Sequence, residues 1–190
     1  MKEENWEKKR NIICRYNESA KVFDSLYKAE QNLKIKKALG AIRIRYSDMV
    51  LDVGCGTGFL FEHIFKDIGF LVGLDLSQEL LRLATIRSKS LHDGNNISLI
   101  RADADHMPFQ REIFDKVFAL TLSQNIPDFN RTLQEMMRVA KKDSTIVVTG
   151  LKKIFSKEEF IEFLNDADLE FSIIDADNQL RDYVAICHKK

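Results

Sequence analysis

Short, almost continuously apolar runs recur along the chain, separated by segments with a different hydrophobic period. Five such runs occupy residues 49–53, 70–76, 97–101, 114–122 and 145–149. Apolar runs of this length are typical of strands that are buried on both faces. The intervening residues 59–68, 78–91 and 128–140 repeat apolar side chains at helical spacing, which predicts helices. Alternating strands and helices predict a mostly parallel sheet with helices on both faces.

The N-terminal segment has a helical pattern throughout. Apolar side chains recur along one face from Ala29 to Ile42, and no proline interrupts them. That stripe is wide enough to pack on a sheet. We therefore expect residues 1–46 to form a helical cap that precedes the alternating core of residues 47–150.

The C-terminal part, residues 151–190, predicts one helix and two further strands. Ser156 and Glu159 have the spacing of a capping box, which predicts a helix that ends near residue 167. Residues 170–176 and 182–188 have strand patterns with a short connection, which favours an antiparallel pair. The expected fold is α/β: a Rossmann-like, seven-stranded, mostly parallel sheet with helices on both faces and an antiparallel C-terminal hairpin.

The composition is that of an ordinary globular protein. A chain of 190 residues is long enough for one substantial core, so we expect residues 1–190 to form a single domain. Hydrophobic residues make up 45% and charged residues 31%, which excludes disordered and collagen-like chains. No apolar run approaches the roughly 20 residues of a membrane helix. The polar N-terminus does not resemble a secretory signal, so we expect a cytoplasmic protein without a membrane partner.

The cysteines, histidines and charges give weaker signals. The three cysteines and four histidines are dispersed and lack zinc-site spacing, so we expect no metal. The net charge is zero, but residues 1–46 hold twelve Lys and Arg against six Asp and Glu. This basic segment either attracts phosphates or is a solvated helical face.

A glycine-rich stretch is the strongest chemical signal. Gly54, Gly56 and Gly58 directly follow the apolar run that contains Asp52, and a helix is expected next. Glycines allow positive φ and a close approach of ligand to backbone, and the amides that open the helix face that ligand. Such a pattern also suits a dinucleotide enzyme. Asp52 changes this balance, because a carboxylate is unfavourable beside a pyrophosphate and favourable beside a cation.

Two further acids follow the next two strands. Asp75 ends the second strand, where a carboxylate either accepts hydrogen bonds from ribose hydroxyls or caps a loop. Asp103 follows the third strand and is placed to accept from an adenine amine. The backbone amide of Ala104 is placed to meet a ring nitrogen of the same base.

Together, these segments resemble the class I S-adenosylmethionine-dependent methyltransferase superfamily, and most closely its ubiquinone- and menaquinone-biosynthesis type enzymes. The matching text lies between residues 48 and 150 and reads LDVGCGTG, GLDLS, DADHMPF, FDKVFAL, LQEMMRVAKK and TIVVTG. The N-terminal stretch YNESAKVFDSLY also resembles that group's lead-in. The resemblance implies S-adenosylmethionine as cofactor, residues 47–150 as the cofactor-binding core, and methyl transfer by SN2 displacement.

The resemblance also implies roles for individual residues. The three glycines border the methionine part of the cofactor, Asp75 binds ribose, and Asp103 with Ala104 binds adenine. Tyr16 either covers the cofactor or is a core aromatic. The candidate cofactor-binding residues are Asp52, Gly54, Cys55, Gly56, Gly58, Asp75, Leu76, Asp103, Ala104 and Thr121.

The loop after the fourth strand departs from the family pattern. Asn125 stands where a histidine is usual, so a histidine base has no counterpart there. The candidate catalytic residues are Gln124, Asn125, Asp128 and Tyr16, of which Gln124 and Asn125 either hydrogen-bond the acceptor or brace the loop. Residues 141–144 replace the family's usual turn and are expected to form a different one. The methyl acceptor stays open between a small molecule and RNA or protein.

Two other functions compete with methyl transfer. A non-catalytic binding or scaffold subunit would keep the fold, and the strand at residues 97–101 would then be a sheet edge open to a protein partner. A nicotinamide-dependent oxidoreductase is disfavoured, because Asp52 precedes the loop and the glycine spacing is G-x-G-x-G rather than G-x-G-x-x-G.

Overall fold

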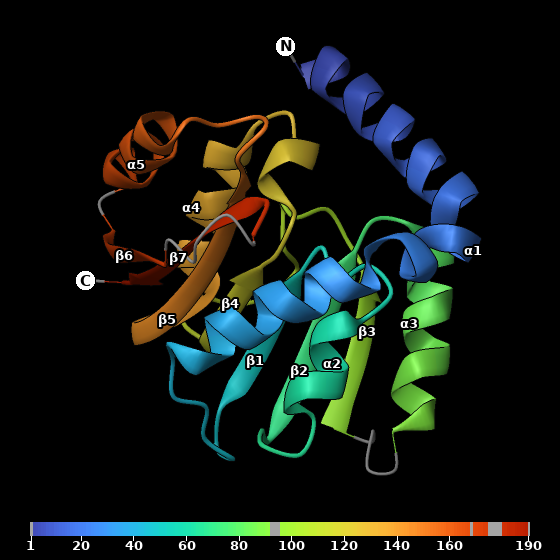
Figure 1. The fold of residues 1–190 in the computed structure, drawn as a ribbon, viewed down its shortest axis with the longest axis horizontal. Helices are drawn as coiled ribbons and strands as arrows, with labels where there is room; N and C mark the ends of the chain where they lie inside the picture. The colour runs from blue at the N-terminus through green and yellow to red at the C-terminus, as the bar shows by residue number, and fades with distance from the viewer. Residues whose placement is uncertain (1, 92–95, 168, 175–179, 190) are drawn as a thin grey trace.

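A computed structural model describes residues 2–91, 96–167, 169–174 and 180–189 of the chain. Strands and helices alternate along most of it (Figure 1). The helices are α1 (Lys2–Gly40), α2 (Phe59–Ile64), α3 (Gln78–Ser90), α4 (Phe129–Val139) and α5 (Lys157–Asp166), with a short 3-10 turn η2 (Ser123–Asn125). The strands are β1 (Met49–Val53), β2 (Phe70–Asp75), β3 (Ile97–Arg101), β4 (Phe114–Ala119), β5 (Ala140–Leu151), β6 (Glu170–Ile174) and β7 (Asp182–His188).

The strands form one sheet in the order β3-β2-β1-β4-β5-β7-β6. β1 pairs in parallel with β2 and β4, and the parallel pairing continues to β3 on one side and β5 on the other. β7 lies between β5 and β6 and is antiparallel to both. The predicted α/β fold with a seven-stranded, mostly parallel sheet and an antiparallel C-terminal pair is confirmed. The strand order reverses between β1 and β4, and ligands of such sheets bind at this switch point.

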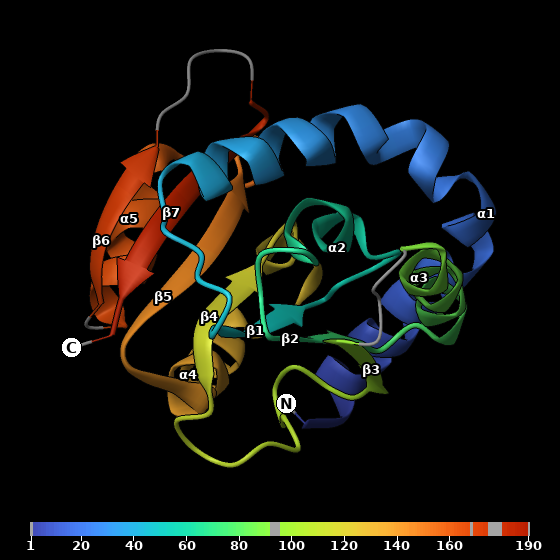
Figure 2. The ribbon, with the colours of Figure 1, turned by 90° about the horizontal axis from the view of Figure 1, so that it is seen from below.

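Helices cover both faces of the sheet (Figure 2). The core that contains side chains of α1, α2 and α3 lies on one face, and the core of α4 and α5 lies on the other. Successive side chains of β5 alternate between them: Val147 packs with the first core, while Ile146 and Val148 pack with the second. This alternation explains why the strand sequences are apolar at almost every position.

Polar side chains fix the starts of three helices. Ser77 and Asp128 each accept a hydrogen bond from the backbone amide three residues further on, at 3.2 Å and 3.1 Å. Ser156 and Glu159 form the predicted capping box, in which each side chain accepts from the other residue's backbone amide. A cap of this kind stabilises a helix by about 1 kcal/mol. The caps of α3 and α4 also hold the loops that border the cavity described below.

β5 is longer than the sequence pattern predicts. It begins at Ala140, so residues 141–144, expected to form a turn, belong to the strand. The register against β4 shifts between Phe114 and Lys116, and Asp143 has a φ of 59°. Such an irregularity absorbs polar residues without ending the strand.

Two other elements end at least three residues earlier than expected. β4 stops at Ala119 instead of residue 122, because Thr121 adopts a φ of 60° in the left-handed region. α2 stops at Ile64 instead of residue 68, and the amide of Asp67 closes a tighter turn onto the Ile64 carbonyl at 2.9 Å. β6 stops at Ile174, and the last two residues of that predicted strand lie outside the described residues.

α1 is long and bent, so its two halves lie over different parts of the molecule (Figure 1). Ile35 and Ala38 of the C-terminal half are buried against the sheet, and Gln31 is buried on the same face. Ala29, expected in the apolar stripe, is exposed. It lies about 200° around the helix from Gln31, on the solvent side. Within the described part of the chain, no helix is both long and apolar enough to cross a membrane.

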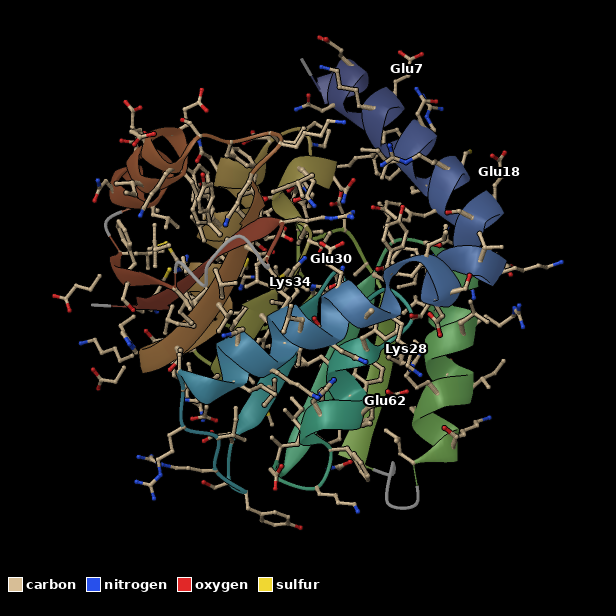
Figure 3. The ribbon with its side chains drawn as sticks, in the orientation of Figure 1. Glu7, Glu18, Lys28, Glu30, Lys34 and Glu62 are labelled. Atoms are coloured by element: carbon tan, nitrogen blue, oxygen red, sulfur yellow. The ribbon has the colours of Figure 1, made fainter. Side chains whose placement is uncertain are left out.

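A buried ion pair fastens this half of α1 to the sheet. Lys34 is fully buried, and its Nζ lies 2.6 Å from Oδ2 of Asp182, which is also buried. The same Nζ donates to the Thr121 hydroxyl at 2.6 Å and lies 3.8 Å from the carboxylate of Glu30. Figure 3 places Lys34 and Glu30 on the part of α1 that crosses the sheet. α1, the end of β4 and the start of β7 therefore meet at one charged contact.

This ion pair predicts that loss of Lys34 alone destabilises the protein, whereas loss of Lys34 and Asp182 together destabilises it much less. Lys34→Met leaves the Asp182 carboxylate buried without its cation, and we expect the free energy of unfolding to fall by about 3–5 kcal/mol. The double substitution Lys34→Met with Asp182→Leu removes both charges and is expected to restore most of that loss. Urea unfolding followed by circular dichroism measures both values. A single variant as stable as the wild type would contradict the structural role of the pair.

Candidate functional site

A glycine turn joins the end of β1 to α2 at the switch point of the sheet. Gly54, Gly56 and Gly58 have φ values of 72°, 56° and 84°, which residues with a Cβ rarely adopt. The amide of Gly54 donates to the Leu74 carbonyl of β2 at 2.7 Å. A Cβ on Gly54 would lie 2.6 Å from Cδ1 of Leu122, so the turn packs directly on the loop after β4.

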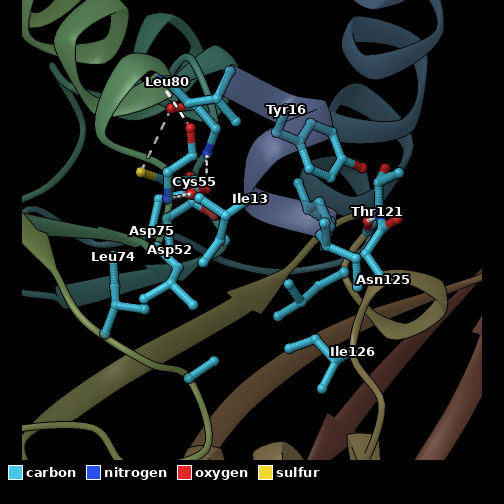
Figure 4. Close-up of a pocket in the computed structure, with 18 of the residues that line it drawn as sticks. Ile13, Tyr16, Asp52, Cys55, Leu74, Asp75, Leu80, Thr121, Asn125 and Ile126 are labelled. Carbon is cyan, nitrogen blue, oxygen red and sulfur yellow. Dashed lines mark hydrogen bonds between the residues drawn. The ribbon is translucent and has the colours of Figure 1, made fainter. Parts of the chain in front are cut away.

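Asp75, the last residue of β2, ties this turn to the next loop. Its two carboxylate oxygens accept from the backbone amides of Gly56 at 2.9 Å and Ser77 at 2.8 Å (Figure 4). The Ser77 hydroxyl donates to the side chain of Asn17 in α1 at 2.6 Å. A carboxylate offers about four acceptor positions, so Asp75 retains capacity for a ligand.

Asp52 in β1 is a second buried acid at these strand ends, with 3% of its surface exposed. Burial, reinforced by the charge of Asp75, raises the pKa of Asp52 from 3.8 to about 8. Burial also raises the pKa of Asp75, although its hydrogen bonds from backbone amides oppose the rise. The site thus disfavours two negative charges in isolation, and a cationic ligand would favour both.

The strand ends border a cavity of about 140 Å³. Figure 4 shows Asp52 and Asp75 on one side of it and Tyr16, Thr121 and Asn125 on the other. α1 covers the cavity with the side chains of Lys9, Ile12, Ile13, Tyr16, Phe23, Gln31 and Ile35. One long helix therefore contributes to both sides of the site.

Thr121 is held in a strained conformation on the far side of this cavity. Its amide donates to the Thr149 hydroxyl at 2.7 Å, and its hydroxyl accepts from Gln31 at 2.8 Å and Lys34 at 2.6 Å. The backbone carbonyl of Thr121 accepts from the side-chain amide of Asn125 at 2.9 Å. A non-glycine residue with this φ costs about 1–3 kcal/mol and persists where its surroundings enforce it. These bonds fix the loop that carries Asn125.

Tyr16 and Arg15 of α1 approach the same loop. The Tyr16 ring packs edge-on against Phe23 with centroids 5.9 Å apart, and the Arg15 guanidinium lies 5.2 Å from the Tyr16 ring. Burial raises the pKa of Tyr16, so its hydroxyl keeps its proton at neutral pH. Arg15 also donates to the Asn125 side chain at 3.0 Å. Tyr16 can therefore donate a hydrogen bond here but is not a base.

Nine of the ten candidate cofactor-binding residues line this cavity. The exception is Gly58, which is the N-cap residue of α2. Among the candidate catalytic residues, Tyr16 and Asn125 line the cavity, and Gln124 lies in a shallower groove outside it. Asp128 is exposed, and its carboxylate caps α4 rather than facing the cavity.

The cavity also contains residues that sequence reasoning missed, above all Lys9 and Gln31. The Lys9 Nζ lies 2.7 Å and 2.8 Å from the two carboxylate oxygens of Asp103. A charged N-terminal run is typical of a solvated helix face, so the sequence alone does not distinguish Lys9 from its exposed neighbours. The available signal is helical spacing, because Lys9 shares a face with apolar residues three and four positions on and with Tyr16 seven positions on.

The profile of a family described as a methyltransferase domain matches residues 45–181. The chain belongs to this methyltransferase domain family. It is 32% identical over 134 residues to an uncharacterized protein of Methanocaldococcus jannaschii, covering 70% of this chain and 49% of that protein. It is 33% identical over 119 residues to a demethylmenaquinone methyltransferase of Lactobacillus johnsonii, covering 61% and 49%. This methyltransferase-family chain spans about half the length of these curated relatives.

Solved structures show the same fold as this methyltransferase-family chain. An S-adenosylmethionine-dependent methyltransferase from Aquifex aeolicus has a TM-score of 0.77 at 18% identity, covering 92% of this chain and 98% of that one. A putative methyltransferase in complex with the Haloferax volcanii Trm112 methyltransferase activator has a TM-score of 0.74 at 20% identity, covering 88% and 93%. The predicted membership of the class I S-adenosylmethionine-dependent superfamily is confirmed, with S-adenosylmethionine as cofactor.

The donor set of the cavity fits that cofactor. The ligand carries positive charge, and the buried acids Asp52 and Asp75 disfavour their own ionisation without a cation. Asp103 supplies a further carboxylate at the end of the cavity that Lys9 covers. The missing side chains of the glycine turn allow a ligand to approach its backbone closely, although the amides of Gly54 and Gly56 already donate to Leu74 and Asp75.

The raised pKa of Asp52 predicts how stability varies with pH in the ligand-free protein. The folded pKa of about 8 lies above the usual value of 3.8, so the folded state holds a proton that the unfolded state releases between these pH values. The free energy of unfolding should therefore fall as pH rises, by up to about 1.4 kcal/mol per pH unit between about pH 5 and 7. The destabilisation that Asp52 causes is absent below the lower pKa, grows between the two pKa values and is constant above the higher one.

Chemical unfolding at a series of pH values measures this slope. Asp52→Asn should flatten it, while Asp67→Asn, which changes an exposed acid, should keep the wild-type slope. Parallel slopes in the wild type and Asp52→Asn would show that Asp52 ionises normally in the folded protein.

Proposed function

We propose that this protein is an enzyme that transfers the methyl group of S-adenosylmethionine to a small, largely apolar acceptor. The observation that carries the proposal is the meeting of a glycine turn with Asp52, Asp75 and Asp103 around one cavity at the switch point of the sheet. When bound, S-adenosylmethionine supplies a methyl group on a positively charged sulfur. The membership of the methyltransferase domain family supports this chemistry.

In the proposal, the residues at the strand ends have distinct binding roles. Asp75 accepts hydrogen bonds from the ribose hydroxyls, with the acceptor positions that its bonds to backbone amides leave open. Asp103 and the amide of Ala104 bind adenine, while Leu76 lies beside the nucleoside. Asp52 and the glycine turn, including Cys55, hold the cationic methionine end.

The acceptor then lies on the opposite side of the cavity. Thr121, Asn125 and Gln31 supply polar groups there. Apolar side chains also line the cavity, among them those of Ile12, Ile13, Phe23, Leu122 and Ile126. α1 covers this side and is bonded to the loop after β4 through Arg15 and Asn125. A covered and mostly apolar cavity favours a small molecule over RNA or a folded protein.

The residues of this chain contribute alignment and exclusion of water rather than a strong base. An SN2 displacement requires the attacking atom, the methyl carbon and the departing sulfur to lie in line, and a closed cavity enforces such geometry. Burial raises the pKa values of both Tyr16 and Cys55, so neither side chain is ionised at neutral pH. This arrangement suits an acceptor that attacks with little proton removal, such as an amine.

A protein partner is compatible with this function. β3 is an edge strand of the sheet, so one side of it has no strand neighbour among the described residues. The structural neighbour in complex with a Trm112 activator supports the idea that a protein of this fold takes a protein partner. The alternative of a non-catalytic scaffold has less support, because the cofactor cavity is complete in the residue types that the fold requires.

The ribose role of Asp75 predicts a defect in cofactor binding. Asp75→Ala should weaken binding of S-adenosylhomocysteine by roughly 1.5–3 kcal/mol through the loss of charge-assisted hydrogen bonds. Isothermal calorimetry measures the dissociation constant, and circular dichroism confirms that the variant is folded. Asp67→Ala, at an exposed acid outside the cavity, is the matched control and should bind as the wild type. An unchanged constant in Asp75→Ala would remove the ribose assignment.

The proposed acceptor class predicts where a labelled methyl group goes. Purified protein incubated with methyl-labelled S-adenosylmethionine and fractionated cell extract should label the small-molecule fraction. Label in RNA or protein would contradict the acceptor class but preserve the enzyme. Cofactor binding without transfer to any fraction would favour the scaffold alternative. Transfer by the purified chain alone would exclude an obligatory activator.

A further inference from the structure

A lysine in the N-terminal half of α1 forms ion pairs across the cavity with the loop after β3. Lys9 has 8% of its surface exposed, and its Nζ contacts both carboxylate oxygens of Asp103, at 2.7 Å and 2.8 Å. The same Nζ also bonds to the carboxylate of Asp105, which is buried. A helix at the start of the chain is thus joined to the loop after β3 through two acids.

The partner acids differ in how they are otherwise held. Asp105 also accepts a hydrogen bond from the Thr132 hydroxyl of α4, and its carbonyl accepts from Arg131 at 3.2 Å. Asp103 accepts from the backbone amide of Asp105 at 3.1 Å, so the two acids form one rigid loop. Among these partners, Lys9 is the one that belongs to α1, so a movement of α1 would remove it and leave the bonds from α4 in place.

The position of Lys9 conflicts with occupation of the cavity by the cofactor. Its ammonium group lies against both oxygens of Asp103, the carboxylate that the proposed function gives to the adenine amine. The cavity volume is about 140 Å³. Pockets for drug-sized ligands usually enclose ~300–1000 Å³. Lys9 thus occupies the proposed adenine acceptor, and the cavity, although partly open to solvent, is narrower than such a ligand needs.

The inward face of this half-helix is built from the residues that close the cavity. Lys9, Ile12, Ile13 and Tyr16 line it at helical spacing. Figure 3 shows Glu7 on the same half-helix pointing away from the body of the molecule. Besides Lys9, the side-chain bonds that join this half-helix to the strand-end loops run through Arg15 to Asn125 and through Asn17 to Ser77. The first of these is exposed and the second is part-buried, whereas the bond of Lys9 to Asp105 is buried and is therefore the most resistant to water.

We propose that Lys9 is a latch: its ion pair with Asp103 and Asp105 holds the N-terminal half of α1 over the cavity, and the adenine end of the cofactor takes its place on Asp103. The inference rests on the proposed function, because it uses the assignment of Asp103 to adenine. Opening exposes both carboxylates to water, which replaces the hydrogen bonds that Lys9 supplied. A ligand that binds the open form has an apparent affinity reduced by the fraction of molecules that are open.

The first test needs no ligand. Lys9→Met removes the cation while keeping an unbranched side chain, and it should speed hydrogen exchange of the backbone amides of residues 4–18 by about tenfold or more. Lys21→Met makes the same charge change at an exposed position of α1 and should exchange as the wild type. Mass-spectrometric exchange also shows whether the sheet amides stay protected, which separates opening of α1 from global unfolding. Wild-type exchange of residues 4–18 in Lys9→Met would overturn the latch.

The second test measures entry of the ligand. Trp6, the single tryptophan of the chain, lies one helical turn before Lys9 and is 44% exposed, so its fluorescence reports on this half-helix. S-adenosylhomocysteine, which has no net charge, avoids a simple electrostatic effect of removing a cation. Stopped-flow mixing should give an association rate about tenfold higher in Lys9→Met, with an apparent affinity raised by a similar factor. Lys21→Met should match the wild type.

The remaining outcomes also decide the proposal. Weaker binding by Lys9→Met would mean that Lys9 contacts the bound ligand, and it would overturn the latch. Lys9→Gln, which keeps a hydrogen-bond donor without the charge, should lie between Lys9→Met and the wild type in both measurements. It replaces Lys9→Met as the deciding variant if the latter does not fold. If the wild type binds no S-adenosylhomocysteine, the proposed function fails, while the exchange of residues 4–18 still decides whether Lys9 holds α1 closed.

Discussion

A pair of acids buried where β1 and β2 end is the constraint on which the rest of the site depends. Burial raises the pKa of both Asp52 and Asp75, and the charge of Asp75 raises the pKa of Asp52 further. The surrounding groups moderate this charge: the backbone amides of Gly56 and Ser77 stabilise Asp75 directly. The parallel topology makes the problem unavoidable, because the carboxyl ends of neighbouring strands meet at one edge. A cationic ligand is the one component that relieves the repulsion and occupies the space that the glycine turn leaves open.

Each half of α1 directs a buried lysine toward acids of other elements, but the surroundings of the two lysines differ. In the C-terminal half, Lys34 and the apolar residues around it are fully buried, and the ion pair with Asp182 anchors the helix to the sheet. In the N-terminal half, Lys9 and its neighbours close a cavity instead of a core, and its acids belong to a loop that binds ligand in the proposed function. A buried pair between packed elements has nothing to replace it. A pair at the rim of a cavity has a ligand that competes for the same acid.

Local signals made most of the fold and most of the strand-end residues that line the cavity predictable, and long-range pairings made the rest unpredictable. A glycine turn after an apolar run and a serine before a helix are legible from a few residues, and parallel strands then bring Asp52 and Asp75 together. The contact of Lys9 with Asp103 joins positions 94 residues apart, and no local pattern tells which charge a helical lysine meets. Thr121 misleads in the other direction: threonine favours strands, so its left-handed φ at the end of β4 is not visible in the sequence.

The features that lower stability lie at the carboxyl ends of the parallel strands. The bonds that these features make connect the two sides of the cavity. The strain of about 1–3 kcal/mol at Thr121 lies on the same cavity as the buried Asp52. Helix caps and core faces elsewhere obey local preferences, and proteins depart from these chiefly at functional sites. Lys9 on the adenine side and Arg15 on Asn125 belong to one rigid half-helix. Lifting that half-helix would therefore open both sides of the cavity in one movement, so in the proposed function the cofactor and the acceptor would share a single entrance.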